Sequence, residues 1–290
     1  MKVTDKCTAQ ADQMVYISDF TPLKSAHAQD SLKQAQELDV DFICVAYNPG
    51  KVVRVASAIL AHTIKQQTQK DVIFNLSTRD MNKLALQSHL LGAQMLGLDN
   101  VVVIKGDSFT EQDLSLVKAV NDFNPTTLIQ AMATMNAGQD YKGLKLQTPT
   151  DLCIGATIDL GRGLEPEAKL TQRKVQAGAH FFITQPVFSS EEITAFREAY
   201  QVVAGTELSQ PVFFGLQIFR RDGILFSNVP EAIRQDLAKG REGTEIALEI
   251  LHQLQALGIR RIYLIPPILK GGVRDYEAAQ QVLERARSPK

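Results

Sequence analysis

Two carboxylates, one carboxamide and three basic side chains are the residues of this sequence best suited to chemistry. They are Asp19, Asp107, Gln185, Lys105, Arg173 and Lys174. A carboxyl group can exchange protons with a heterocycle, and basic side chains can hold the phosphates of a cofactor. This set predicts a site that binds a phosphate-bearing cofactor and performs acid catalysis on a heterocyclic substrate.

Several other chemistries lack their residue patterns. The segment Gly161-Arg162-Gly163 lacks the spacing of a dinucleotide fingerprint, and the sequence has neither a P-loop nor a serine-nucleophile elbow. The histidines and the three cysteines have no metal-ligand spacing, so we expect no metal site. A net charge of −1, from 31 Lys+Arg against 32 Asp+Glu, argues against a nucleic-acid binder. No stretch is apolar for long enough to be a signal peptide or a membrane span, so we expect a soluble, cytoplasmic protein.

Eight short apolar runs, alternating with longer amphipathic stretches, must position the candidate residues. Each run is apolar on both faces, as is typical of parallel strands buried between helices and a core. The runs are Met14–Ile17, Phe42–Ala46, Val72–Leu76, Val101–Ile104, Cys153–Ile158, Phe181–Thr184, Val212–Leu216 and Ile262–Ile265. The amphipathic stretches, which predict helices, are Lys24–Leu38, Val52–Gln67, Met81–Leu96, Glu165–Ala177, Ser190–Val203 and Glu242–Leu257.

This alternation predicts a single-domain (β/α)8 TIM barrel over residues 1–290. A doubly wound open sheet is the alternative, because periodicity cannot show whether a sheet closes. Within the long stretch Ser108–Thr150 we expect a helix at about Pro125–Met135 and a turn at Asn136–Gly138. A further helix start is indicated by Asn228-Val229-Pro230. Polar residues or tight turns follow at least six runs, so we expect them to meet at the C-terminal rim and to bind something large and polar.

A family resemblance is carried by Asn75–Asp107 (NLSTRDMNKLALQSHLLGAQMLGLDNVVVIKGD), Ile154–Phe188 (IGATIDLGRGLEPEAKLTQRKVQAGAHFFITQPVF) and Gly258–Pro267 (GIRRIYLIPP). All three are similar to segments of the methylenetetrahydrofolate reductase family, and the resemblance runs from about Val15 to the C-terminus. It implies a (β/α)8 barrel that holds FAD at its C-terminal rim and takes hydride from NADH or NADPH. The implied reaction reduces 5,10-methylenetetrahydrofolate to 5-methyltetrahydrofolate, in one-carbon metabolism and methionine synthesis. Because family members commonly self-associate, we expect a homo-oligomer.

The resemblance also implies roles for individual residues. Asp19 takes the place of the family's catalytic glutamate, Asp107 lies beside the flavin and the folate, and Gln185 contacts the pterin. The implied cofactor contacts are Tyr47, Asn75, Lys105, Gly106, Asp107, Thr157, Glu167, Arg173 and Lys174. The implied substrate contacts are Asp19, Asp107, Gln185, Gln217 and Phe219.

The implied reaction needs an acid, because N10 of the folate must be protonated to open the imidazolidine ring before hydride arrives. Asp19 is the candidate acid, although its side chain is one methylene shorter than that of glutamate. A second departure from the family lies in Gly215–Gly223, which lacks the usual Gly-Ile-Leu-Pro turn. These departures motivate alternatives: a non-catalytic homologue that binds folate or a methyltransferase partner, a flavin-free reductase, or an enzyme that oxidises 5-methyltetrahydrofolate.

Overall fold

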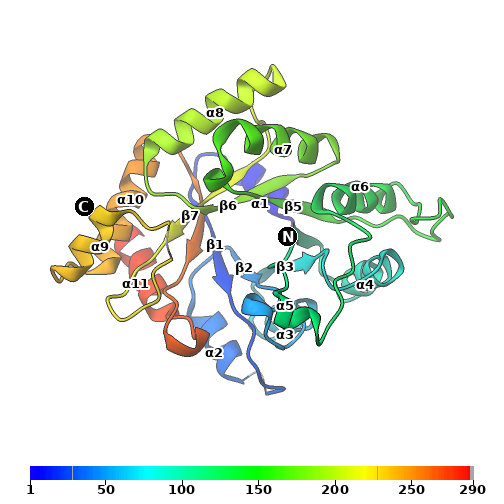
Figure 1. The fold of residues 1–290 in the computed structure, drawn as a ribbon, viewed down its shortest axis with the longest axis horizontal. Helices are drawn as coiled ribbons and strands as arrows, with labels where there is room; N and C mark the ends of the chain where they lie inside the picture. The colour runs from blue at the N-terminus through cyan, green and yellow to red at the C-terminus, as the bar shows by residue number, and fades with distance from the viewer. Residues whose placement is uncertain (28, 227, 288–290) are drawn as a thin grey trace.

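A closed barrel of eight parallel strands forms the centre of the computed structural model, which describes residues 1–27, 29–226 and 228–287 (Figure 1). The strands are β1 (Val15–Phe20), β2 (Phe42–Val45), β3 (Asp71–Ser77), β4 (Asn100–Ile104), β5 (Cys153–Ile158), β6 (Phe181–Pro186), β7 (Val212–Gln217) and β8 (Arg261–Ile265). Each strand pairs with the next in sequence, and the ring closes where β8 pairs with β1. This closure confirms the predicted (β/α)8 barrel and excludes the open sheet.

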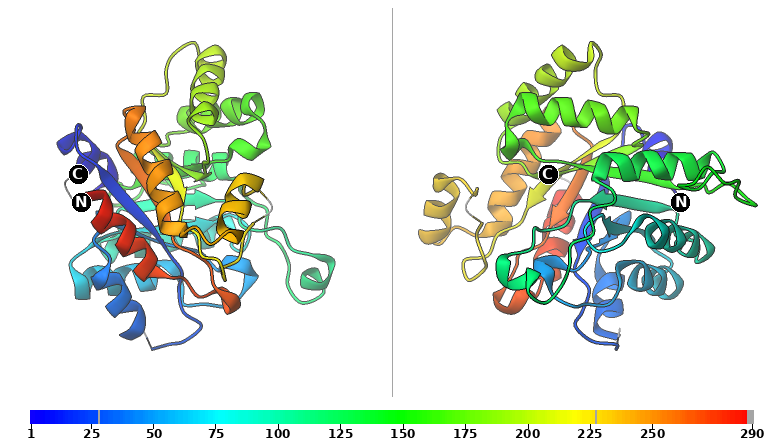
Figure 2. Two further views of the ribbon diagram at one scale, coloured as in Figure 1. Left: turned by 90° about the vertical axis from the view of Figure 1, so that its left-hand side faces the viewer. Right: turned by 45° about the vertical axis from the view of Figure 1, so that its right-hand side comes forward.

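Helices surround the strands on the outside of the barrel (Figures 1 and 2). The α-helices are α1 (Val3–Ala9), α2 (Gln29–Glu37), α3 (Ser57–Thr68), α4 (Lys83–Met95), α5 (Glu111–Leu114), α6 (Pro125–Asn136), α7 (Leu164–Gln176), α8 (Ser190–Ala204), α9 (Glu231–Ala238), α10 (Gly243–Ala256) and α11 (Tyr276–Arg287). Three single 3-10 turns are η1 (Pro49–Lys51), η2 (Leu160–Arg162) and η3 (Lys270–Gly272). No helix among the described residues is both long and apolar enough to cross a membrane.

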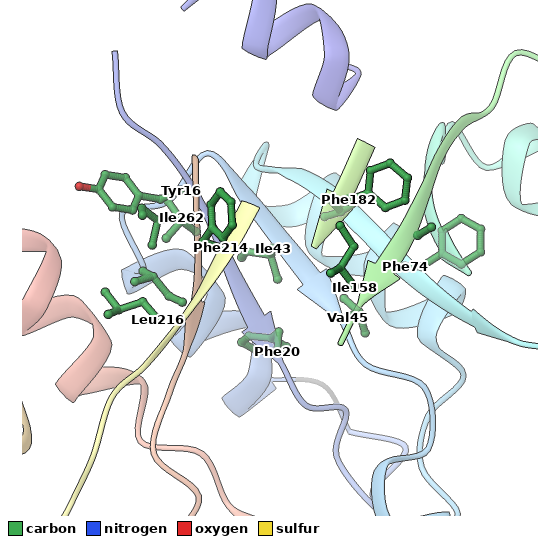
Figure 3. Packing of buried hydrophobic residues seen from close by; sticks show 14 of the residues in the cluster. Tyr16, Phe20, Ile43, Val45, Phe74, Ile158, Phe182, Phe214, Leu216 and Ile262 are labelled. Atoms are coloured by element: carbon green, nitrogen blue, oxygen red, sulfur yellow. The ribbon is translucent and has the colours of Figure 1, made fainter. Parts of the chain in front are cut away.

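The strands bury both of their faces, which divides the core into two layers. Outward side chains such as Phe74, Phe182 and Phe214 pack between the sheet and the helices (Figure 3). Inward side chains such as Phe42 and Phe213 fill the barrel, and Val3 and Cys7 of α1 join this inner cluster. Because α1 packs against the inner cluster, the N-terminal end of the barrel is closed. The C-terminal end is the one at which a ligand can enter.

Two helices are shorter than their hydrophobic patterns predict, because local hydrogen bonds hold the chain outside a helix. In the stretch Lys24–Leu38, the amide of His27 donates to the Ser25 hydroxyl, and α2 spans only Gln29–Glu37. Ala28 of this stretch lies outside the described residues. In the stretch Val52–Gln67, the amide of Val55 donates to the carbonyl of Leu23, so α3 begins only at Ser57.

The two interruptions of the alternation contain the expected helices. Helix α6 begins after a capping box in which Asn124 accepts from the amide of Thr127, and it continues to Asn136, one residue past the prediction. Helix α9 follows Pro230, as the Asn-Val-Pro signal indicates. The segment that carries α5 extends outward from the barrel (Figure 2).

Candidate active site at the C-terminal rim

A cavity of about 730 Å³ lies at the C-terminal rim, which we call the rim cavity. This volume is within the range of roughly 300–1,000 Å³ that small-molecule sites occupy. Its lining includes nine of the residues expected from the sequence: Asp19, Tyr47, Asn75, Lys105, Gly106, Asp107, Thr157, Gln185 and Gln217. Asp19, Asn75, Thr157, Gln185 and Gln217 are brought together by the two-residue period of the strands. Each occupies an inward position at or near the C-terminal end of its strand.

The floor of the rim cavity contains a buried ion pair. The Asp19 carboxylate is 5% exposed, and its Oδ2 lies 2.6 Å from Nη2 of Arg274. The Tyr263 hydroxyl donates to Asp19 Oδ1 at 3.0 Å. Burial, together with the charge of Asp19, raises the pKa of Tyr263 well above its usual value, so its hydroxyl remains a donor. Asp19 is thus held by a guanidinium on one oxygen and by a neutral phenol on the other.

Arg274 is fixed in place by the end of β1 and by the segment after β8. Its Nε donates to the Thr21 hydroxyl at 3.2 Å, and its Nη1 donates to the Pro266 carbonyl at 3.1 Å. Two residues later, the Tyr276 hydroxyl accepts from the amide of Thr21 at 2.8 Å. The segment between β8 and α11 thus holds both Asp19 and the backbone that follows it.

On the opposite side of the rim cavity, a tight turn after β4 presents Lys105 and Asp107. Gly106 has a φ of +81°, and a Cβ at this position would lie 2.5 Å from the Ser77 hydroxyl oxygen. That hydroxyl donates to the Lys105 carbonyl at 3.1 Å, and Arg79 Nη1 donates to the Asp107 carbonyl at 2.8 Å. Both contacts fix the backbone of the turn, while the side chains of Lys105 and Asp107 stay exposed at the mouth.

Carboxamide and hydroxyl groups occupy the wall between these two sides. Asn75 is 7% exposed and accepts from Cys44 Sγ at 3.3 Å. Gln217 is 5% exposed, and its Oε1 is buried with no hydrogen-bond partner among the described residues. Burial and the neighbouring charge of Asp80 raise the pKa of Tyr47 to about 12, so this hydroxyl is neutral. Because an unpaired buried oxygen is costly, Gln217 Oε1 is available to accept a hydrogen bond from a ligand or a water molecule in the rim cavity.

Four of the expected residues do not line the rim cavity. Glu167 and Lys174 form a buried pair at 3.6 Å beneath its wall, and Lys174 Nζ donates to the Thr157 carbonyl. Burial raises the pKa of Glu167 and lowers that of Lys174. Arg173 is exposed on α7, and Phe219 is 2% exposed within the outer core.

The sequence analysis missed Tyr263 and Arg274, which contact Asp19 directly. The strand period gave one signal for Tyr263, because a tyrosine at an inward position near the end of β8 carries a polar group into the barrel. For Arg274 no local signal exists, since only closure of the ring brings it to β1.

The family model described as methylenetetrahydrofolate reductase matches residues 4–266 of this chain. The chain belongs to the methylenetetrahydrofolate reductase family. The matched region contains all eight strands and ends before Arg274.

Two solved structures have a similar fold. The first is an uncharacterized protein from Clostridium thermocellum that binds two copies of 5-methyl-5,6,7,8-tetrahydrofolic acid. Its TM-score is 0.68 at 15% identity, and the alignment covers 98% of each chain. The second is a protein from Burkholderia cenocepacia J2315 named as a candidate lyase or mutase. Its TM-score is 0.52 at 13% identity, covering 98% of this chain and 84% of the other.

Proposed function

We propose that this family member interconverts 5,10-methylenetetrahydrofolate and 5-methyltetrahydrofolate with FAD as its cofactor, and that NAD(P)H reduces the flavin. The observation that carries the proposal is the Asp19 carboxylate, paired at the floor of a cavity whose wall is rich in carboxamides. Family membership supports a folate-related reaction. The binding of 5-methyltetrahydrofolate by the Clostridium thermocellum protein supports a reduced folate as the ligand. In this proposal, residues 1–290 act as one catalytic domain.

The donor groups of the rim cavity fit a flavin. The Asn75 carboxamide and the Thr157 hydroxyl lie at inward positions where they can bind the polar edge of the isoalloxazine ring. The neutral Tyr47 hydroxyl can donate there as well, and the exposed ammonium of Lys105 can meet the phosphates. Lys174 is already paired with Glu167, so we assign it no phosphate contact. When bound, FAD would accept or supply the hydride.

Gln185 and Gln217 complete the site on the pterin side. Gln185 is exposed to the rim cavity, and Gln217 Oε1 lacks a partner among the described residues. The reduced pterin carries N–H donors that match these carboxamide oxygens. Two carboxamides from adjacent strands would fix the orientation of the folate and place its N10 towards Asp19.

Asp19 would handle the proton of N10. In the reducing direction, the imidazolidine ring opens and N10 gains a proton, for which the Asp19 carboxyl must first be protonated. In the oxidising direction, N10 attacks the methylene carbon and loses a proton, which the ionised Asp19 accepts. Arg274 and Tyr263 would hold the Asp19 side chain in place for this transfer. Because the same carboxyl group serves both directions, the oxidation of 5-methyltetrahydrofolate is the second candidate function.

The proposal is tested by the visible spectrum of the purified protein under anaerobic conditions. We expect a flavin spectrum that bleaches with NADH or NADPH and returns on addition of methylenetetrahydrofolate. Bleaching of the oxidised protein by 5-methyltetrahydrofolate alone would establish the second function. We expect Asp19→Asn to slow either reaction by about 100-fold or more, and Asp12→Asn, an exposed position before β1, to leave the rates unchanged. A protein that takes up no flavin and turns over neither folate would overturn the proposal.

A further inference from the structure

A second cavity, of about 580 Å³, borders the rim cavity. We call it the Arg54 cavity, after the arginine in its wall. It lies between the segment after β1, helix α2 and the segment that contains η3. Arg274 lines both cavities, and Thr21 and Tyr276 line the second one. The two cavities therefore meet at Arg274.

Arg54 carries a positive charge that the described residues do not balance. Its Nη1 donates to the Pro22 carbonyl at 2.6 Å, while its buried Nε has no partner in the described part of the chain. None of the carboxylates in residues 1–27, 29–226 and 228–287 forms an ion pair with it, although Asp19 balances its neighbour Arg274. Burial and the charge of Arg274 lower the pKa of Arg54. A partly buried guanidinium beside another cation is unfavourable unless an anion joins it.

The shape of the cavity wall leaves the guanidinium accessible. Gly272, in the turn after β8, has a φ of +78°, and a Cβ at this position would lie 3.4 Å from Arg54 Nη2. Because residue 272 has no side chain, none covers this side of the guanidinium, which also lines the cavity.

We propose that the Arg54 cavity binds the glutamate carboxylates of the folate, so that one ligand spans both cavities. This inference rests on the proposed function, because it takes N10 of the folate to lie beside Asp19. The aminobenzoyl-glutamate part of a folate is attached at N10. Since Arg274 forms an ion pair with Asp19, a chain that leaves N10 on that side meets Arg274 first and Arg54 next.

The charges around the cavity agree with an anionic occupant that can be extended. The charged side chains of its wall are Lys24, Lys33, Arg54, Arg274, Asp30 and Glu37. Lys33 and Glu37 face each other at 3.9 Å on the solvent side, where both are mostly exposed. Lys24 is exposed near the mouth. Additional glutamates would therefore run past cations rather than into a wall of carboxylates.

The test compares the binding of three ligands by isothermal titration calorimetry. These are 5-methyltetrahydropteroate, which has no glutamate, and 5-methyltetrahydrofolate with one or with three glutamates. We expect the wild-type protein to bind the monoglutamate about 10-fold tighter than the pteroate, as a charge-assisted hydrogen bond implies. Arg54→Gln should reduce this ratio to about 2-fold, and Arg54→Lys should retain part of it.

The matched control is Arg260→Gln. Arg260 is also partly buried and donates to a backbone carbonyl, that of Gln255, but it precedes β8 at the opposite end of the barrel. This variant should keep the wild-type ratio, and thermal unfolding of each variant checks that it is folded.

An unchanged ratio in folded Arg54→Gln would overturn the proposal, and so would weaker NADPH binding with an unchanged ratio. If the wild-type protein binds the pteroate and the folate equally, the Arg54 cavity does not bind the glutamate, while folate binding itself stands. If it binds neither, the proposed function itself fails.

Discussion

Replacing Arg274 with methionine tests how much the buried ion pair between Arg274 and Asp19 stabilises the protein. The pair is well shielded from water, with 12% of the Arg274 side chain and 8% of the Asp19 side chain exposed. Removing one partner of a buried ion pair costs about 3–5 kcal/mol, because the other charge remains buried without compensation. We expect Arg274→Met to lower the free energy of unfolding by this amount at pH 8.

A double-mutant cycle with Asp19→Asn separates the ion pair from the other contacts of Arg274. Arg274 also donates to Thr21 and Pro266, and these contacts are lost whether residue 19 is charged or neutral. We expect a coupling free energy of about 2 kcal/mol between residues 19 and 274, measured by urea unfolding of the four proteins. A coupling below about 0.5 kcal/mol would refute the reasoning. Arg274 would then stabilise the fold through Thr21 and Pro266 alone.

Three further predictions concern single positions. Gly106→Ala should lower the free energy of unfolding by about 1–3 kcal/mol more than Gly205→Ala does, as measured by thermal unfolding. Both glycines have a positive φ, but only at Gly106 would a Cβ meet a hydroxyl oxygen at 2.5 Å. Equal losses in the two variants would contradict this reasoning. Burial lowers the pKa of His89 from its usual 6.5. The unfolded chain therefore binds a proton at this histidine at a higher pH than the folded protein does. Stability should therefore fall as the pH drops below about 6.5, and His89→Leu should flatten this dependence in urea titrations at pH 5 and 7; an identical slope would exclude His89 as its origin. Tyr263→Phe leaves Asp19 Oδ1 without its hydrogen-bond donor and should lower the free energy of unfolding by about 1–3 kcal/mol in the same urea titrations. A change of less than about 0.3 kcal/mol would show that another donor replaces the tyrosine.

The strands were predictable because their burial on both faces leaves a continuous apolar run in the sequence. Cys153–Ile158 is predicted with the bounds that β5 has, and the other runs differ from their strands by one to three residues at an end. Helix starts were harder to predict, because single polar contacts decide them. The Ser25 hydroxyl and the Leu23 carbonyl each hold a segment outside a helix that its apolar spacing alone would extend.

The predicted site residues that line the rim cavity are those that the barrel topology brings together. Asn75, Thr157 and Gln217 follow from knowing only that parallel strands end at a common rim and that side chains alternate between the two faces of a strand. The partner of Asp19 could not be predicted in this way. Whether a guanidinium reaches that carboxylate depends on the path of the chain after β8, which no local pattern of the sequence specifies. The ion pair with Arg274 and the hydrogen bond from Tyr263 are therefore features of Asp19 that only the structure reveals.

The contacts between β1 with the residue after it and the segment after β8 set an order in which the site is completed during synthesis. The amide of Thr21 and the hydroxyl of Tyr276 meet across 255 positions, and the Asp19–Arg274 pair spans the same gap. A ribosome that adds about 5–20 residues per second needs roughly 13 to 51 s to pass from one half of this contact to the other. Throughout that interval the Asp19 carboxylate has no guanidinium, so burying it by early closure of the nascent barrel is disfavoured. The ion pair at the floor of the rim cavity can then form only at the last step, after the residues beyond β8 have left the ribosomal tunnel.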